Sequence, residues 1–178
     1  MGTTTGAGVT VRPATPEDAA AIARVHVAAW RWAYAGLLDD ALLAGLDVDA
    51  SRRLWEQVAS EGRKTLLVAE RDGAVVGFVA AGRSRDEDAT DVTGEIYAIY
   101  LLREAQGSGV GAALMDAALA ALTAARCTEA TLWVLATNAL ARSFYECGGW
   151  RPDGSERTER EHDGEPTSEL RYRRSLRD

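Results

Sequence analysis

One stretch constrains the fold more than any other: residues 95–112, where a strand pattern runs into a glycine-rich turn and then a helix pattern. From Glu95 to Leu102, β-branched and aromatic residues supply apolar side chains on both faces. That pattern is typical of a central strand covered on both sides. After Gly111 an apolar stripe at helical spacing begins. The sequence therefore predicts a buried strand joined directly to a helix.

The turn between strand and helix is typical of an anion site. Gly107, Gly109 and Gly111 would let a phosphate approach the backbone without Cβ collisions. The first N–H groups of the helix have no intrahelical partner, and the helix dipole places partial positive charge there. A tight connection with close packing is the alternative.

Two common phosphate loops do not fit the turn. A dinucleotide-binding turn needs an acidic residue at the end of the next strand. That strand, predicted over residues 131–136, ends instead in Thr137 and Asn138. A nucleoside-triphosphate loop needs Lys followed by Ser or Thr after the glycines, and neither pair is present.

Length and composition narrow the remaining classes. The 178 residues suit one domain, predicted over residues 9–178 after a disordered tail at 1–8. A net charge of −7 argues against nucleic acid as a partner. No apolar run approaches membrane-spanning length and no signal peptide is apparent, so we expect a cytoplasmic protein. No cluster of ligand residues suggests a metal site.

The order of the elements indicates an α/β fold. Strand and helices are followed by three strands, then helix, strand, helix and a final hairpin, which predicts a mixed sheet with helices on both faces. The strands flanking the long helix form a βαβ unit, hence a parallel pair with a right-handed crossover.

A second informative segment covers residues 132–150. Asn138 follows a strand and is predicted to cap the next helix. Tyr145 lies seven residues later, close to two helical turns, so both side chains should face the same way. Phe144 should point into the core. A cap without further role, and a packed aromatic, are the alternatives for Asn138 and Tyr145.

Together the two segments resemble the GNAT family of N-acetyltransferases. The first carries Gln-x-x-Gly-x-Gly from Gln106 to Gly111, and the second carries Asn-x-x-Ala-x-x-Phe-Tyr-Glu-x-x-Gly-Trp from Asn138 to Trp150. The resemblance extends over most of the chain. It implies a single domain whose mixed, mostly antiparallel sheet has six to seven strands, with helices on both faces and two central strands splayed.

The resemblance also implies acetyl-CoA as cosubstrate and no metal. The coenzyme's pyrophosphate would sit on the turn, and its pantetheine arm would lie along the central strand like an added strand. Asn138 would bond the arm. The implied cofactor-binding residues are Ile99, Leu101, Gln106, Gly107, Ser108, Gly109, Val110, Gly111, Ala112 and Asn138.

Reference pKa values assign two catalytic roles. The acceptor is expected to be an ammonium that must lose a proton, and Glu95, placed on the same strand face as Tyr97 and Ile99, is the candidate base, directly or through a water. An edge carboxylate paired with a surface arginine is the alternative. Tyr145 is the candidate acid that protonates the leaving thiolate.

The predicted activity is acetyl transfer to a primary amine by direct attack in a ternary complex. The acceptor would be a small amine such as a polyamine, amino acid or antibiotic. Acidic residues near Asp39, Asp40 and Glu95 would favour polyamines. The alternatives are a protein N-terminal or lysine acetyltransferase and a non-catalytic acyl-CoA sensor. Trp30–Leu38 is predicted to be a helix end packed on the core or a wall of the acceptor pocket. A homodimer is compatible with the resemblance.

Overall fold

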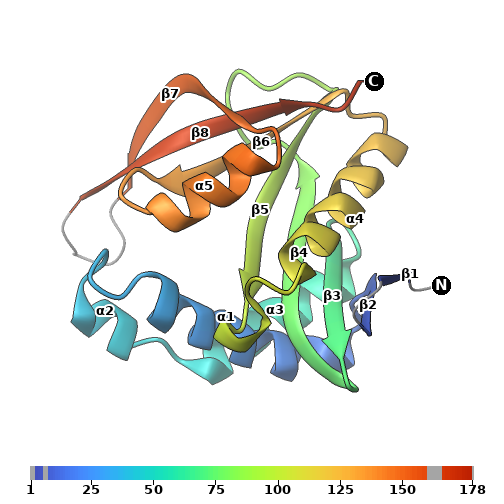
Figure 1. The fold of residues 1–178 in the computed structure, drawn as a ribbon, viewed down its shortest axis with the longest axis vertical. Coiled ribbons are helices and arrows are strands. Elements are labelled where there is room, and N and C mark those ends of the chain that lie inside the picture. The colour runs from blue at the N-terminus through green and yellow to red at the C-terminus, as the bar shows by residue number, and fades with distance from the viewer. Residues whose placement is uncertain (1–2, 6–7, 160–165, 178) are drawn as a thin grey trace.

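A computed structural model describes residues 3–5, 8–159 and 166–177. All the strands of these residues belong to one sheet, ordered β1-β2-β3-β4-β5-β6-β8-β7 (Figure 1). Their bounds are Thr3–Thr5 (β1), Val9–Pro13 (β2), Thr65–Arg71 (β3), Ala74–Arg83 (β4), Thr93–Leu101 (β5), Glu129–Leu135 (β6), Arg151–Glu159 (β7) and Thr167–Ser175 (β8). The helices are Ala19–Ala33 (α1), Asp40–Ala44 (α2), Val48–Glu61 (α3), Val110–Ala124 (α4) and Ala139–Cys147 (α5), with short 3-10 turns at Pro16–Asp18 and Arg103–Ala105.

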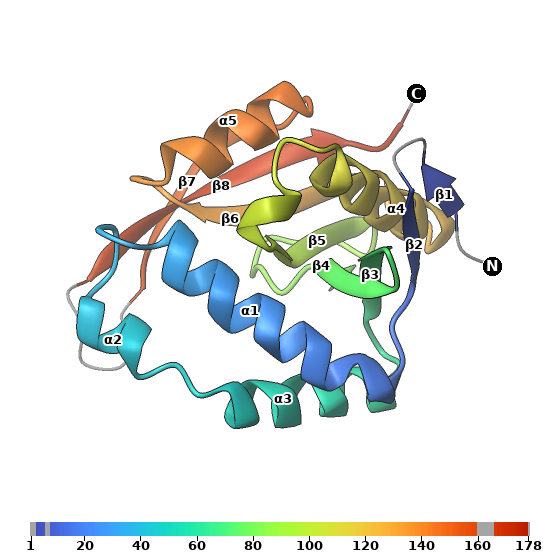
Figure 2. The same cartoon turned by 60° about the horizontal axis from the view of Figure 1, so that its bottom comes forward.

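The helices cover both faces of the sheet, as the sequence predicts. Figure 2 shows α4 and α5 on one face and α1 with α3 on the other. One buried cluster joins α4 to the sheet around Leu114, Leu122 and Leu132. A second joins α1 and α3 to the opposite face around Ile22, Trp55 and Phe78. The sheet is thus the middle layer of three, which is the α/β architecture expected.

The sheet is split between β5 and β6. These strands form the parallel pair predicted from the βαβ pattern, but they pair only over Thr93–Glu95 and Glu129–Thr131. Beyond Glu95 they diverge, while β5 continues to pair with β4 and β6 with β8 (Figure 1). The predicted splaying of two central strands is confirmed. It leaves one backbone edge of β5 without a strand partner.

A β-bulge on β5 changes which residues share a face. Ala98 pairs with Ala80 and Ile96 with Ala81, so Tyr97 has no partner across the ladder. One extra residue reverses the alternation of side chains. Ile99 therefore packs on the α4 side, whereas Tyr97 packs on the α1 and α3 side. The expectation that Glu95, Tyr97 and Ile99 share one face is wrong for this reason.

Two terminal predictions also need comment. Disorder was expected over residues 1–8, but Thr3–Thr5 form β1 and pair antiparallel with β2. The final hairpin is present as β7 and β8, while its predicted turn at residues 162–164 lies outside the described residues. Within the described ranges, none of the helices has the length and apolar character needed to span a membrane.

Candidate active site

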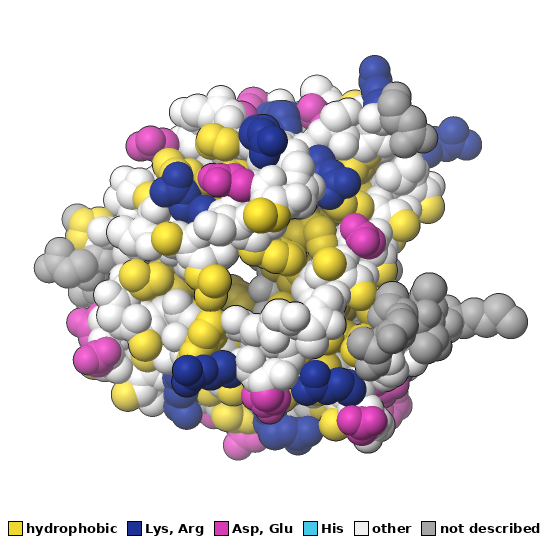
Figure 3. Space-filling model, in the orientation of Figure 1, with side chains coloured by type: hydrophobic (Ala, Val, Ile, Leu, Met, Phe, Trp, Pro, Cys, Tyr) yellow, Lys and Arg dark blue, Asp and Glu magenta, His cyan; other side chains and the backbone are white. Residues whose placement is uncertain are grey.

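A cavity of about 770 Å³ lies where β5 and β6 diverge. Figure 3 shows the opening near the middle of one face, surrounded by hydrophobic side chains. The lining comes from α1, α2, β5, the β5–α4 turn, β6, α5, β7 and β8. The cavity thus extends from the glycine-rich turn at one end of β5 to Glu95 at the other.

The glycine-rich turn presents bare backbone to this cavity. Gly107 and Gly109 have φ angles of +69° and +83°, which residues with a side chain rarely adopt. No atom lies within 4 Å of the position that a Cβ would take on either residue. The turn ends at Val110, where α4 begins. Since the N–H of Ala113 bonds to the carbonyl of Gly109 at 3.0 Å, the preceding amides have no intrahelical acceptor.

Most of the predicted cofactor-binding residues line the cavity. Ser108 and Val110 do not: the Ser108 hydroxyl donates to the carbonyl of Ala105 at 2.6 Å, and the Val110 side chain is buried in the core. Only their main-chain groups remain for a ligand. The predicted residues that do line the cavity are Ile99, Leu101, Gln106, Gly107, Gly109, Gly111, Ala112 and Asn138.

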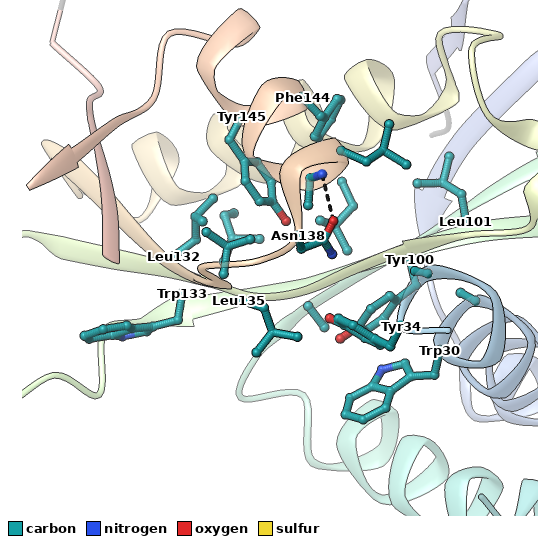
Figure 4. A pocket seen from close by; sticks show the side chains of 18 of the residues that line it. Trp30, Tyr34, Tyr100, Leu101, Leu132, Trp133, Leu135, Asn138, Phe144 and Tyr145 are labelled. Atoms are coloured by element: carbon teal, nitrogen blue, oxygen red, sulfur yellow. Dashed lines mark hydrogen bonds between the residues drawn. The ribbon is translucent and has the colours of Figure 1, made fainter. Parts of the chain in front are cut away.

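Asn138 caps α5 and also faces the cavity. Its Oδ1 accepts a hydrogen bond from the N–H of Ala141 at 3.1 Å, which fixes the side chain (Figure 4). No bond to its Nδ2 is found among the described residues, so this donor is available to a ligand. Asn138 is 8% exposed. Because an unpaired donor costs free energy when it is buried, a ligand atom that accepts from Nδ2 would be favoured. The cap predicted from sequence is therefore present, together with a free amide.

Tyr145 lies on the same side of the cavity as Asn138 (Figure 4). Its hydroxyl makes no hydrogen bond to the described residues. Burial, with a smaller contribution from nearby Tyr34, raises the pKa of Tyr145, so the phenol stays protonated at neutral pH. The preceding Phe144 does not enter the core as predicted. It is 38% exposed and lines the cavity, packed over Gly111, where a Cβ would meet its ring at 3.3 Å.

Glu95 also lines the cavity, but its carboxylate is already engaged. It is 2% exposed and accepts three hydrogen bonds from Arg85: from the main-chain N–H at 2.9 Å, from Nε at 3.2 Å and from Nη2 at 2.6 Å. The sequence could not name Arg85 as the partner, because its loop lies apart from the strand.

Aromatic side chains line two parts of the cavity. Trp30 of α1, Tyr34 just after that helix and Tyr100 of β5 lie on the side opposite Tyr145, and Trp133 of β6 lies further along (Figure 4). The stretch Trp30–Leu38 contains the end of α1 and also lines the cavity through Trp30, Tyr34 and Leu38. That this wall contacts the acceptor stays a prediction. The sequence did not predict that Trp133, β7 and β8 line the cavity, because no local sequence pattern indicates it.

Comparison with known proteins identifies the family. The model of the Acetyltransferase (GNAT) family matches residues 19–149. An uncharacterized N-acetyltransferase of Bacillus subtilis, YuaI, is 34% identical over 130 residues, which cover 73% of each chain. The chain belongs to the GNAT family. Its GNAT motifs are the same two segments that form the turn and the Asn138–Tyr145 wall of the cavity.

Solved structures share the GNAT fold. PaiA N-acetyltransferase from Thermoplasma acidophilum, solved in complex with coenzyme A, superposes with a TM-score of 0.75 at 18% identity, over 94% of this chain and 98% of that chain. A Salmonella typhimurium protein, YncA, solved with acetyl-CoA, gives 0.72 at 20% identity, over 96% and 95%. Family membership makes this chain an acetyl-CoA-dependent acetyltransferase. No group of His, Cys, Asp or Glu suited to a metal is found among the described residues.

Proposed function

We propose that this enzyme transfers the acetyl group of acetyl-CoA to the nitrogen of a small primary amine, with Tyr145 as the general acid. One observation carries the proposal. A protonated phenol without a hydrogen-bond partner among the described residues lines the cavity where the two strands separate. The partly buried hydroxyl faces the cavity without a partner among the described residues, so its natural partner is an atom of the substrate.

The cavity accounts for how the donor substrate would lie. Its pyrophosphate would be bound by the main-chain amides of residues 107–112 at the start of α4. Its pantetheine arm would run along the unpaired edge of β5, bonding backbone groups of Ile99 and Leu101 as an added strand would. The Nδ2 group of Asn138 would bond an amide oxygen of the arm. This arrangement leads the thioester towards Tyr145.

The chemical step follows from that placement. The neutral amine attacks the thioester carbon, the C–N bond forms, and the C–S bond breaks. The nitrogen loses one proton, and the sulfur of the leaving coenzyme A gains one. Tyr145 donates its proton to the thiolate as charge develops there and recovers one from the amine side. The raised pKa of Tyr145 keeps the phenol protonated through the neutral range but also makes it a weaker acid than a free phenol. Donation therefore depends on the placement of the hydroxyl beside the sulfur.

The role of Glu95 as base stays a prediction. Its oxygens accept three bonds from Arg85, which makes direct proton abstraction from the amine unfavourable. Transfer through a water that contacts the carboxylate is the version that the geometry permits. The contacts also support a different task, which is to hold Arg85 in place at the cavity wall.

The size of the cavity supports a small acceptor. About 770 Å³ must contain the pantetheine arm as well as the amine, and cavities of this size suit small molecules. The walls are formed by α1, α2 and the strands on several sides, so a folded protein surface would have to insert an extended segment to reach Tyr145.

The test is an acceptor screen with purified enzyme. Acetyl-CoA is mixed with polyamines, amino acids, aminoglycosides and short peptides, and release of the coenzyme thiol is followed with a thiol-reactive dye. We expect release with at least one class of small amine and none without an amine. Calorimetric binding of acetyl-CoA with no release for any acceptor would contradict the proposal and favour a non-catalytic sensor.

A further inference from the structure

The carboxylates that line the cavity are each bonded within the protein. Glu95 is paired with Arg85 at 2.6 Å, and Glu169 is paired with Arg157 at 2.6 Å. Asp39 accepts the N–H of Ala41 at 2.6 Å as the cap of α2. The acidic pocket expected near Asp39, Asp40 and Glu95 is only partly present: Glu95 is neutralised by Arg85, and Asp40 does not line the cavity. Asp39 keeps its charge, because its partner is a neutral main-chain N–H. A polyamine would find both cavity glutamates already paired with arginines, which leaves Asp39 as its countercharge among the described lining residues.

Arg85 is the group that faces outward from the Glu95 pair. Its side chain is 61% exposed, while that of Glu95 is 3% exposed, so the carboxylate lies behind the guanidinium. Nε and Nη2 donate to Glu95, and Nη1 makes no bond to the described residues. The guanidinium carbon lies 4.4 Å from the centre of the Tyr97 ring. This cation–π contact holds the guanidinium over the ring. Arg85 thus presents an unused pair of donors at the cavity wall.

The loop that carries Arg85 is anchored across the split in the sheet. Asp86 accepts hydrogen bonds from Trp133 Nε1 at 2.9 Å and from Arg171 Nη1 at 3.2 Å. Arg171, which is 5% exposed, also forms two bonds of 2.6 and 2.7 Å with Asp88. These contacts join the β4–β5 loop to β6 and β8. The position of Arg85 is therefore fixed in two ways. Its own side chain bonds Glu95, and the adjacent Asp86 bonds Trp133 and Arg171.

We propose that Arg85 recognises the acceptor, and that the acceptor is an amino acid or a close relative, with a carboxylate beside the amine to be acetylated. This rests on the proposed function. A guanidinium held by a buried carboxylate and stacked on a ring is preorganised to bind a second carboxylate with its outer edge. The neutral Arg85–Glu95 pair suits a zwitterion better than it suits a polycation. Trp133, whose Nε1 bonds Asp86 beside Arg85, would then contact the acceptor's side chain.

The experiment compares matched acceptors in the intact enzyme: phenylalanine with phenethylamine, tryptophan with tryptamine, and methionine with 3-methylthiopropylamine. We expect kcat/KM to favour the carboxylate-bearing member of at least one pair by about tenfold or more, the range of a charge-assisted hydrogen bond. Arg85→Gln should bring that ratio close to one, and Arg85→Lys, which keeps the charge but loses the fork, should restore part of it. An unchanged ratio in Arg85→Gln would overturn the proposal.

Two controls separate recognition from folding. Arg83→Gln removes an exposed guanidinium from the end of β4, outside the cavity, and should leave the ratio as in the wild type. Because Arg85→Gln leaves Glu95 buried without its partner, the double variant Arg85→Gln with Glu95→Gln is measured as well. Its loss of preference for the carboxylate should match that of Arg85→Gln, with acetyl-CoA affinity unchanged in all variants.

A binding measurement makes the outcome independent of turnover. Calorimetry on the coenzyme A complex compares N-acetylphenylalanine with N-acetylphenethylamine. Preferential, Arg85-dependent binding of the carboxylate in an enzyme that acetylates nothing would support the Arg85 site while contradicting the proposed function. Equal binding of the two products, or binding of neither, would overturn the Arg85 site even in an active enzyme.

Discussion

At the β5–α4 turn the cavity wall is mostly backbone, whereas around Glu95 it consists of side chains that bond one another. The turn offers amides and glycines from one continuous segment, residues 106–112. The Glu95 end draws on the β4–β5 loop, β6 and β8. A backbone cradle binds a group that every acyl-CoA carries. A side-chain network can differ from one acceptor to the next without disturbing the cradle.

The sharpest expected effect concerns the junction of the two ends, at Tyr145. Tyr145→Phe removes only the hydroxyl, so kcat should fall by roughly 100- to 10,000-fold, the range of general acid catalysis. The dissociation constant for coenzyme A should stay within about twofold, since no described contact of the coenzyme cradle involves this hydroxyl. Steady-state kinetics and calorimetry on the same preparation check both. A variant that keeps wild-type kcat would remove Tyr145 from the mechanism.

The Arg171 network should be the most fragile part of the Glu95 end. Arg171→Met removes the shared arginine from Asp86, Asp88 and Asp153, of which Asp153 retains Arg173. This should lower the free energy of unfolding by roughly 3 kcal/mol. The KM for the acceptor should rise while acetyl-CoA affinity changes little. Urea unfolding and kinetics measure these. Arg174→Met is the matched control and should behave as wild type, because the Arg174 side chain, on the same strand, makes no ion pair or hydrogen bond to the described residues.

The wall behind Trp30 should make stability depend on pH. His26 packs against Trp30, Trp55 and Tyr100, and burial lowers the pKa of His26 to about 4. The unfolded chain binds a proton near pH 6.5 and the native state only near pH 4, so stability is full above pH 6.5 and is lost as pH falls towards 4.

This loss should reach roughly 2 to 3 kcal/mol, and His26→Gln should reduce it. Urea unfolding of both proteins from pH 7.5 to 4.5 measures the difference between their curves. Parallel curves for wild type and variant would show that His26 does not cause the dependence.

The smallest predicted effect distinguishes a loss of coenzyme binding at the glycine-rich turn from a loss of stability. Gly109→Val introduces a β-branched side chain at φ +83° beside the expected phosphate, so the dissociation constant for acetyl-CoA should rise about tenfold. Gly62→Val, at φ +60° after α3, carries comparable backbone strain away from the cavity. It should lose similar stability but keep its affinity. Equal affinity loss in both variants would assign the effect to strain alone.

The same contrast explains what could be predicted from sequence. The strand, turn, cap and helix around Gly109 and Asn138 are local patterns, and the βαβ unit and splayed strands follow from them and from the family resemblance. The bulge at Tyr97 has no such signal, because it is decided by pairing with β4, and it moved Glu95 off the face of Ile99. The contacts of Arg85 with Glu95 and of Arg171 with Asp88 join residues 10 and 83 positions apart, which no periodicity reveals.

The central claim is that acetyl-CoA lies on the main-chain amides at the start of α4, with its sulfur beside Tyr145. A crystal structure of the protein with coenzyme A tests it most directly. We predict pyrophosphate oxygens within hydrogen-bonding distance of amides between Gly107 and Ala112, and the thiol in the gap between β5 and β6 near the Tyr145 hydroxyl. A coenzyme bound elsewhere, or with its sulfur directed away from Tyr145, would contradict the account.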